Sequence, residues 1–136
     1  MKKLMALLLA MALSLFLSGC GRGDASNVSI TNRRSEIYTD RELRSAVDVA
    51  IDYFEKEFDC CTLLEIGYIG DQEGKEFIER ANQYGVDQVI ILVSSFATGP
   101  DGGDGSLNPN DTYRNWRWIL GRNGTGQWKH LDHGYG

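Results

Sequence analysis

The chain of 136 residues has few of the side chains that build metal or disulfide frameworks, with only three cysteines and two histidines. Bases are outnumbered by acids, 14 to 19, and the formal net charge of −5 argues against a general nucleic-acid-binding surface. Only one long apolar run is present, at the N-terminus, which excludes a multi-span membrane protein. The composition, 42% hydrophobic and 24% charged, is typical of one small globular domain rather than of a disordered chain.

Residues 1–19 predict a bacterial export signal. Lys2 and Lys3 give it a positive start, and Leu4 to Phe16 form an apolar run interrupted only by Ser14. This run is shorter than the roughly 20 residues that span a bilayer, so we expect the signal to be removed rather than retained.

The end of this signal, Leu17-Ser18-Gly19-Cys20, resembles the lipobox of bacterial lipoproteins. The resemblance implies that the Cys20 thiol receives a diacylglyceryl group and that the signal is cut just before it. It also implies a lipid anchor on the extracytoplasmic face of the cell membrane, because two acyl chains hold a protein stably. An ordinary secretory signal with a chance cysteine is the alternative.

Residues 20–35 are expected to form a lipidated, flexible tether. The part from Gly21 to Ser35 has few large apolar residues and is rich in Gly, Ser and Asn, which is typical of a connection that lifts a domain off the membrane. The tripeptide Arg22-Gly23-Asp24 is interpreted as a chance match to a cell-adhesion motif. Loss of Lys2 and Lys3 with the signal brings the net charge from −5 to −7.

Two adjacent cysteines, Cys60 and Cys61, remain once Cys20 is lipidated. The sequence leaves open a strained vicinal disulfide, pairing between molecules, or free thiols. The simplest interpretation is a buried thiol that acts as a small hydrophobe.

Residues 36–136 predict one domain that begins with a long amphipathic helix. Thr39 is a good N-cap, Glu42 completes a capping box, and apolar residues follow at spacings of three and four. A second helix is expected between Asp71, as its cap, and Gly85, as its left-handed end. Strands are expected over 62–69, 88–96, 113–121 and 127–133, with 88–96 buried on both faces and an Asn-Gly turn joining the last two.

The order α-β-α-β-β-β, with two helices on a curved, mainly antiparallel sheet, predicts the α+β class. It looks like the cystatin-like or nuclear-transport-factor-two-like cone, in which a long helix packs into a bent sheet. A ferredoxin-like arrangement is the alternative, because the strand, helix and strand over 62–96 also fit a parallel crossover.

The domain contains five distinctive runs: YTDRELRSAVDVAIDYF, CTLLEIGY, YGVDQVIILVSSF, DGGDGSLNPNDTYRNWRWIL and GQWKHLDHGYG. Together they resemble an uncharacterised family of bacterial exported lipoproteins, catalogued as domain of unknown function 4829. The resemblance covers Ile37 to Gly136, and the GGDGSLNPN loop and the C-terminal run are its most specific parts. It implies surface exposure and a single α+β domain but no known activity, so no functional residue and no cofactor is carried over.

The candidate catalytic residues lie in the last predicted strand. Regular alternation would place His130 and Asp132 on one face and His133 on the other. A His-Asp pair can orient an imidazole for general base catalysis. No nucleophile and no third metal ligand stands at a suitable spacing, so we favour a structural or surface role and expect no metal.

Two other groups of residues suggest ligand hypotheses. The loop over 98–111 is rich in Asp and Asn, but its spacing departs from a calcium loop, so glycine turns and side-chain bonds to the backbone are favoured over a bound ion. An aromatic cluster is expected from Tyr113, Trp116, Trp118 and Trp128. Because Trp116 and Trp118 alternate onto one face, core packing is favoured over a platform that stacks a sugar, peptide or aromatic ligand.

Two functions remain after this weighing. The favoured one is a non-catalytic, lipid-anchored binding or interaction module, and the alternative is a small ligand-binding or enzymatic cone domain. The alternative would use a pocket near His130 and Asp132, with Tyr113, Trp116 and Trp118 as possible ligand-binding residues. A cavity of a few hundred Å³ with His130 or Asp132 at its wall would favour it.

Overall fold

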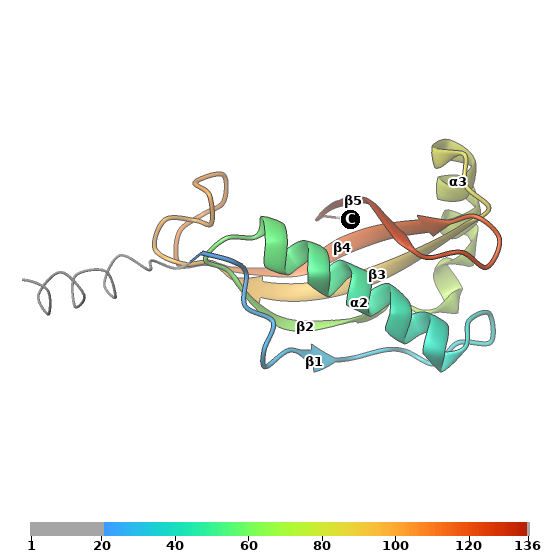
Figure 1. Ribbon diagram of the computed structural model, residues 1–136, viewed down its shortest axis with the longest axis horizontal. Helices are drawn as coiled ribbons and strands as arrows, with labels where there is room; N and C mark the ends of the chain where they lie inside the picture. Colours follow the sequence, from blue (N-terminus) through green and yellow to red (C-terminus); the bar gives the residue numbers. More distant parts are fainter. Residues whose placement is uncertain (1–20, 136) are drawn as a thin grey trace, which may run out of the picture.

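The computed structural model in Figure 1 describes residues 21–135. The export signal and Cys20 therefore lie outside the described residues, as does Gly136. Within 21–135, no helix is long and apolar enough to cross a membrane.

The long helix α2 spans Asp40–Glu57 and begins as predicted. The Glu42 N–H donates to Thr39 Oγ1 at 3.2 Å, and the Thr39 N–H donates to the Glu42 carboxylate at 2.8 Å, so the capping box is complete. Its apolar stripe is buried against the sheet, and α2 lies along one sheet face (Figure 1). The buried residues of α2 are Leu43, Ala46, Val47, Ala50 and Phe54.

Five strands form one open sheet in the order β1-β2-β3-β4-β5. They are β1 (Ser29–Ile30), β2 (Thr62–Tyr68), β3 (Gln88–Ala97), β4 (Thr112–Arg122) and β5 (Lys129–Tyr135). Strand β1 is parallel to β2, and all other neighbours are antiparallel. The predicted α+β class, with two helices on a mainly antiparallel sheet, is confirmed. The ferredoxin-like alternative is wrong, because β2 and β3 are antiparallel neighbours rather than the ends of a parallel crossover.

The middle strand β3 is buried on both faces, as its unbroken apolar run predicts. Leu92 pairs with Trp118 of β4 on the face that α2 covers. Val89 and Ile91 alternate to the opposite face, which packs against the second helix, α3 (Gly74–Tyr84).

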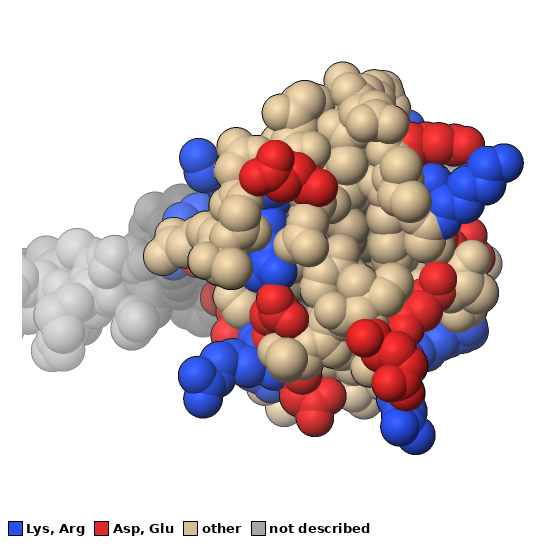
Figure 2. Space-filling model, turned by 90° about the vertical axis from the view of Figure 1, so that its right-hand side faces the viewer, with Lys and Arg blue, Asp and Glu red and all other residues tan. Residues whose placement is uncertain are grey.

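Seen from the end where α2 begins, the molecule has charged side chains of both signs around an uncharged centre (Figure 2).

The start of α3 differs from the prediction. A short turn of 3₁₀ helix, η1 (Asp71–Glu73), precedes it, and no side chain caps either element. Asp71 is not the cap, because its carboxylate accepts hydrogen bonds from Tyr68 and from the segment before α2 instead of from the start of α3. The Ser35 hydroxyl and the Glu36 N–H donate to it at 2.7 and 2.6 Å, and the Tyr68 hydroxyl donates at 2.7 Å. These donors hold the pKa of Asp71 below its usual value. Gly85 ends α3 in the left-handed region, as predicted.

The expected tether is wrong for its described part, residues 21–35, which packs along β2 instead of extending freely. Asp24 bridges Thr62, and the two residues of β1 pair with Glu65 and Ile66. Further along, the Thr31 N–H donates to the Ile66 carbonyl at 2.9 Å. This segment is an edge strand of the sheet.

Two glycines explain why a segment poor in large side chains packs so closely. A Cβ added at Gly67 of β2 would lie 2.3 Å from the Thr31 carbonyl carbon, and one added at Gly23 would lie 2.5 Å from the Phe54 carbonyl oxygen. Glycine here permits close backbone contact rather than flexibility.

The loop over 98–111 is ordered as predicted, by side-chain bonds to its own backbone. Thr98 Oγ1 donates to the Asn108 carbonyl at 2.6 Å and accepts the Asp111 N–H at 2.9 Å. Asp104 accepts the Ser106 N–H at 3.0 Å. The part of the chain that the structure describes contains no group of three or more His, Cys, Asp or Glu residues that could hold a metal ion.

Candidate functional site

A hollow of about 260 Å³ lies where the C-terminal end of α2, the strands β4 and β5, and the 98–111 loop meet. We call it the aromatic hollow. It is lined by Tyr53, Glu57, Phe58, Asp59, Cys61, Gly103, Asp104, Ser106, Leu107, Trp116 and His133. Neither His130 nor Asp132 is at its wall.

Strand β5 departs from regular alternation at Leu131. Leu120 pairs with His130 while the preceding Ile119 pairs with Asp132, so Leu131 is an extra residue in β5. This bulge turns His130 and His133 to the same face, where His130 Nε2 lies 3.0 Å from His133 Nδ1. The prediction that His130 shares a face with Asp132 is therefore wrong, because the bulge breaks the two-residue period.

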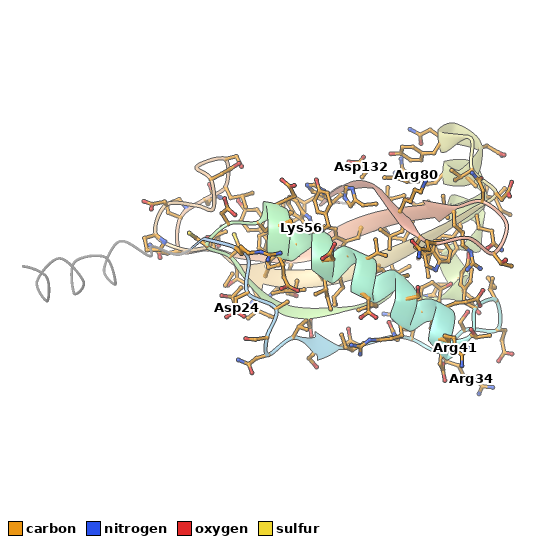
Figure 3. The ribbon with its side chains drawn as sticks, viewed as in Figure 1. Asp24, Arg34, Arg41, Lys56, Arg80 and Asp132 are labelled. Atoms are coloured by element: carbon orange, nitrogen blue, oxygen red, sulfur yellow. The ribbon has the colours of Figure 1, made fainter. Side chains whose placement is uncertain are left out.

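Within residues 21–135, the Asp132 carboxylate forms no hydrogen bond with either histidine ring. Its carboxylate accepts the Tyr84 hydroxyl of α3 at 3.4 Å and its own neighbour's backbone N–H, that of His133, at 2.8 Å. Figure 3 shows Asp132 at the β5 edge, on the side of Arg80 rather than of α2. The two residues of the predicted pair do not form a His-Asp dyad in the described fold.

The two histidines are packed among aromatic rings. The His130 ring stacks on Tyr53 with centroids 3.8 Å apart, and the His133 ring stacks on Trp116 at 5.8 Å. Burial, together with the neighbouring His133, lowers the pKa of His130 to about 4, and burial also lowers the pKa of His133. Both imidazoles are consequently neutral at pH 7, and one ring donates its N–H to the other.

Three of the four aromatic residues of the predicted cluster are core residues, which confirms the packing interpretation for them. Trp118 is fully buried and donates its Nε1–H to Ser94 Oγ at 2.8 Å. Tyr113 is buried and stacks on Phe96, with centroids 5.1 Å apart. Trp128 is buried beneath the Arg122 guanidinium, which lies 4.2 Å from its ring centroid.

Trp116 is the member of that cluster at the wall of the hollow. Its side chain is half-buried, and its Nε1–H is buried without a hydrogen-bond partner in the structure. Buried donors in folded proteins are rarely left without a partner. The unpaired Trp116 N–H is therefore an unusual feature of the wall of the hollow.

The rim of the hollow is acidic. Glu57, Asp59 and Asp104 contribute exposed carboxylates, and no Lys or Arg belongs to the lining. Within residues 21–135, none of these three carboxylates forms an ion pair. The hollow therefore carries an uncompensated negative charge above aromatic walls.

Cys61 forms part of the floor as a free and buried thiol. Its pKa is raised by burial and then by the nearby Asp104 and Asp59 carboxylates, so it is a poor nucleophile at neutral pH. Because Cys61 is a free thiol, a vicinal disulfide with Cys60 is excluded. Its burial confirms the interpretation of Cys61 as a small hydrophobe.

Sequence reasoning identified Trp116 but missed Tyr53 and His133. Tyr53 lies beside the apolar stripe of α2, and an aromatic residue at the edge of such a stripe is a signal that a second packing surface exists. His133 could not be placed without the bulge at Leu131, for which the sequence offers no clear signal.

Neither a family model nor a curated protein nor a solved structure matches this chain.

Proposed function

We propose that this protein is a non-catalytic binding domain, lipid-anchored through Cys20 to the extracytoplasmic face of a bacterial membrane, with the aromatic hollow as its ligand site. The lipobox-like residues before Cys20 and the resemblance to exported lipoproteins support the anchor. The concave shape and mixed lining of the hollow support the binding role.

One observation carries the proposal, namely the position of Gly21 beside the hollow. The Gly21 carbonyl accepts the Cys60 N–H at 3.1 Å, and Asp59 and Cys61, the neighbours of Cys60, line the hollow. Because Cys20 precedes Gly21 by one peptide link of about 3.8 Å, a lipid on Cys20 would hold the hollow at the membrane surface. Figure 1 shows that the blue start of the described segment lies at the same end of the domain as the 98–111 loop and opposite α3.

The chemistry of the nearby side chains favours binding over catalysis. His130 lacks an orienting carboxylate, since Asp132 faces α3, and the His130 ring is held between Tyr53 and His133. The buried thiol of Cys61 has a raised pKa. The enzymatic cone hypothesis with His130 and Asp132 is therefore the weaker of the two functions.

Metabolic labelling tests the anchor. The full chain is produced in a bacterium supplied with an alkyne-bearing palmitate, and lipid incorporation is read after coupling to a dye. We expect labelling of the natural chain, none of Cys20→Ser, and full labelling of the matched control Cys60→Ser. An unlabelled natural chain would contradict the anchor.

A disulfide to Cys60 is the competing use of the Cys20 thiol, because Cys60 lies beside Gly21. Intact mass before and after reduction separates the two. A thioether-linked diacylglyceryl group survives reduction, whereas an intramolecular disulfide gains two hydrogens. A mass change on reduction of the purified mature chain would overturn the anchor.

A further inference from the structure

From the charge and the rings of the aromatic hollow, we infer the class of its ligand: a small organic cation with a primary or quaternary ammonium group. The inference rests on the proposed binding role of this hollow. It is independent of whether Cys20 is lipidated.

Charge gives the sign of the ligand. Three acidic residues, Glu57, Asp59 and Asp104, belong to the lining, and the lining offers no Lys or Arg to an anion. Burial keeps His133 neutral at pH 7, so it adds no positive charge to the wall. The rim carboxylates repel an anionic ligand, whereas they attract a cation.

The walls indicate what kind of cation fits. Tyr53, Phe58 and Trp116 present aromatic rings to the hollow, and ring faces attract ammonium groups within about 6 Å of their centroids. Trp is the strongest of the three partners, and Trp116 is the half-buried one of the four predicted cluster aromatics and lines the hollow. Aromatic walls under an acidic rim are a common means of recognising alkylammonium groups.

A metal ion is a poorer match for the same charges. Ca²⁺ requires six to eight oxygen ligands at about 2.3–2.6 Å, and residues 21–135 hold no cluster of three or more suitable side chains. Asp104 is also engaged by the Ser106 hydroxyl at 2.6 Å. An organic ammonium needs only nearby charge and ring faces, which the hollow provides.

The volume of the hollow and its position in the domain limit the size and the source of the ligand. The hollow, at about 260 Å³, lies below the roughly 300–1,000 Å³ of sites for drug-sized ligands, so the ligand is small or only its head group enters. If the anchor holds this end at the membrane, the ammonium has two possible sources: a free amine or the head group of a zwitterionic lipid. The experiment separates these sources.

The test is a titration of the full mature chain in maltoside detergent, followed by nuclear magnetic resonance of the Trp116 indole N–H. Choline is the probe, and 3,3-dimethylbutan-1-ol, its neutral isostere, is the matched ligand control. We expect choline to shift the Trp116 signal and to bind about tenfold more tightly than the isostere. Equal binding of the two, or no shift with either, would overturn the inference.

Variants of the rim test the charges with little risk to folding, because the side chains are exposed. Glu57→Gln with Asp59→Asn should weaken choline binding about fivefold and leave the isostere unaffected. Glu79→Gln on α3, which removes one exposed carboxylate far from the hollow, is the control and should change neither. Choline affinity that is the same in the double variant as in the natural chain would contradict the role of the rim.

Repeating the titration in dodecylphosphocholine micelles distinguishes the sources. Suppressed choline binding in these micelles indicates that a lipid head group occupies the hollow, whereas unchanged binding indicates a free amine. The palmitate label is read separately, so labelling without choline binding would refute only this inference. Choline binding without labelling would refute only the anchor.

Discussion

The two ends of helix α2 are held in different ways. At its start, charged and polar side chains form one network. Arg122 is buried, and its guanidinium donates to Glu42 at 2.5 Å and to Gln88 at 2.8 Å. The same guanidinium covers Trp128, whose buried Nε1–H has no hydrogen-bond partner within residues 21–135. Arg122 and the Thr39 N–H hold the pKa of Glu42 below its usual value. Nearby, the Tyr38 hydroxyl donates to the Val89 carbonyl at 3.0 Å.

At its other end, α2 packs through rings and backbone bonds instead. Phe58 contacts several aromatic rings, Trp116 keeps an unpaired N–H, and the Gly23 N–H donates to the Glu55 carbonyl at 3.0 Å. This end also contains the hollow and the acidic rim. The contrast teaches that a buried network of charged and polar side chains holds one end of the helix, while the end beside the proposed ligand site combines aromatic packing with exposed carboxylates that form no ion pair within residues 21–135.

The largest expected effect is at the start of α2. Arg122→Met should lower the free energy of unfolding by about 2 kcal/mol, because Glu42 and Gln88 lose their buried partner. The matched control is Arg117→Met, which removes a more exposed guanidinium from the Glu76 carboxylate and should cost less. Urea unfolding of both variants measures the difference. Equal losses would show that the network around Arg122 adds nothing beyond an ordinary surface ion pair.

A smaller effect is expected where residues 21–35 meet the sheet. Gly67→Ala places a methyl group against the Thr31 backbone and should cost about 1–2 kcal/mol, with faster hydrogen exchange of the Thr31 N–H. Gly74→Ala is its control, because no atom lies within 4 Å of the added Cβ. If both variants unfold alike and Thr31 exchanges at the natural rate, the segment is held less closely than described.

The smallest effect concerns the histidine pair and depends on pH. The folded pKa of His130, about 4, lies below its ordinary value of 6.5, so the unfolded chain binds the proton at a higher pH than the folded chain does. Stability is therefore complete above about pH 6.5 and falls as the pH is lowered towards about 4.

Thermal unfolding checks this. Between about pH 7 and about pH 5, the natural chain should lose about 3 °C more in its midpoint than His130→Asn does. Carboxylates that titrate at lower pH affect both proteins equally in this window. An identical pH dependence would mean that His130 is as exposed to water in the folded chain as in the unfolded one.

Local signals in the sequence predicted most of the fold. The capping box of Thr39 and Glu42, the apolar run of β3 and the left-handed Gly85 each act within a few residues, so they could be recognised without the rest of the chain. The strand β1 could not, because two residues in a Gly- and Asn-rich segment carry no periodicity. Its pairing depends on Gly67, far away in the sequence.

The difference between local signals and contacts of distant segments also explains which site residues the sequence predicts. The alternation that places Trp116 and Trp118 on one face is local, and it predicts core packing for both, which holds for the fully buried Trp118, while Trp116 is half-buried at the wall of the hollow. The pairing of His130 with His133 depends on where β5 bulges against β4. The local sequence predicts Asp71 as a helix cap, because Ser35 and Glu36 approach its carboxylate only in the folded chain. Contacts between distant segments, rather than local propensities, decided each departure.

The pairing of residues 21–35 with β2 also has a consequence for timing, if the chain is exported N-terminus first as proposed. Asn32 Oδ1 accepts the Tyr68 N–H, and the two residues are 36 positions apart. During such export, residues 21–35 would have no partner until β2 had followed them. We expect lipid attachment to Cys20 to take place in this interval, before residues 21–35 pair with β2.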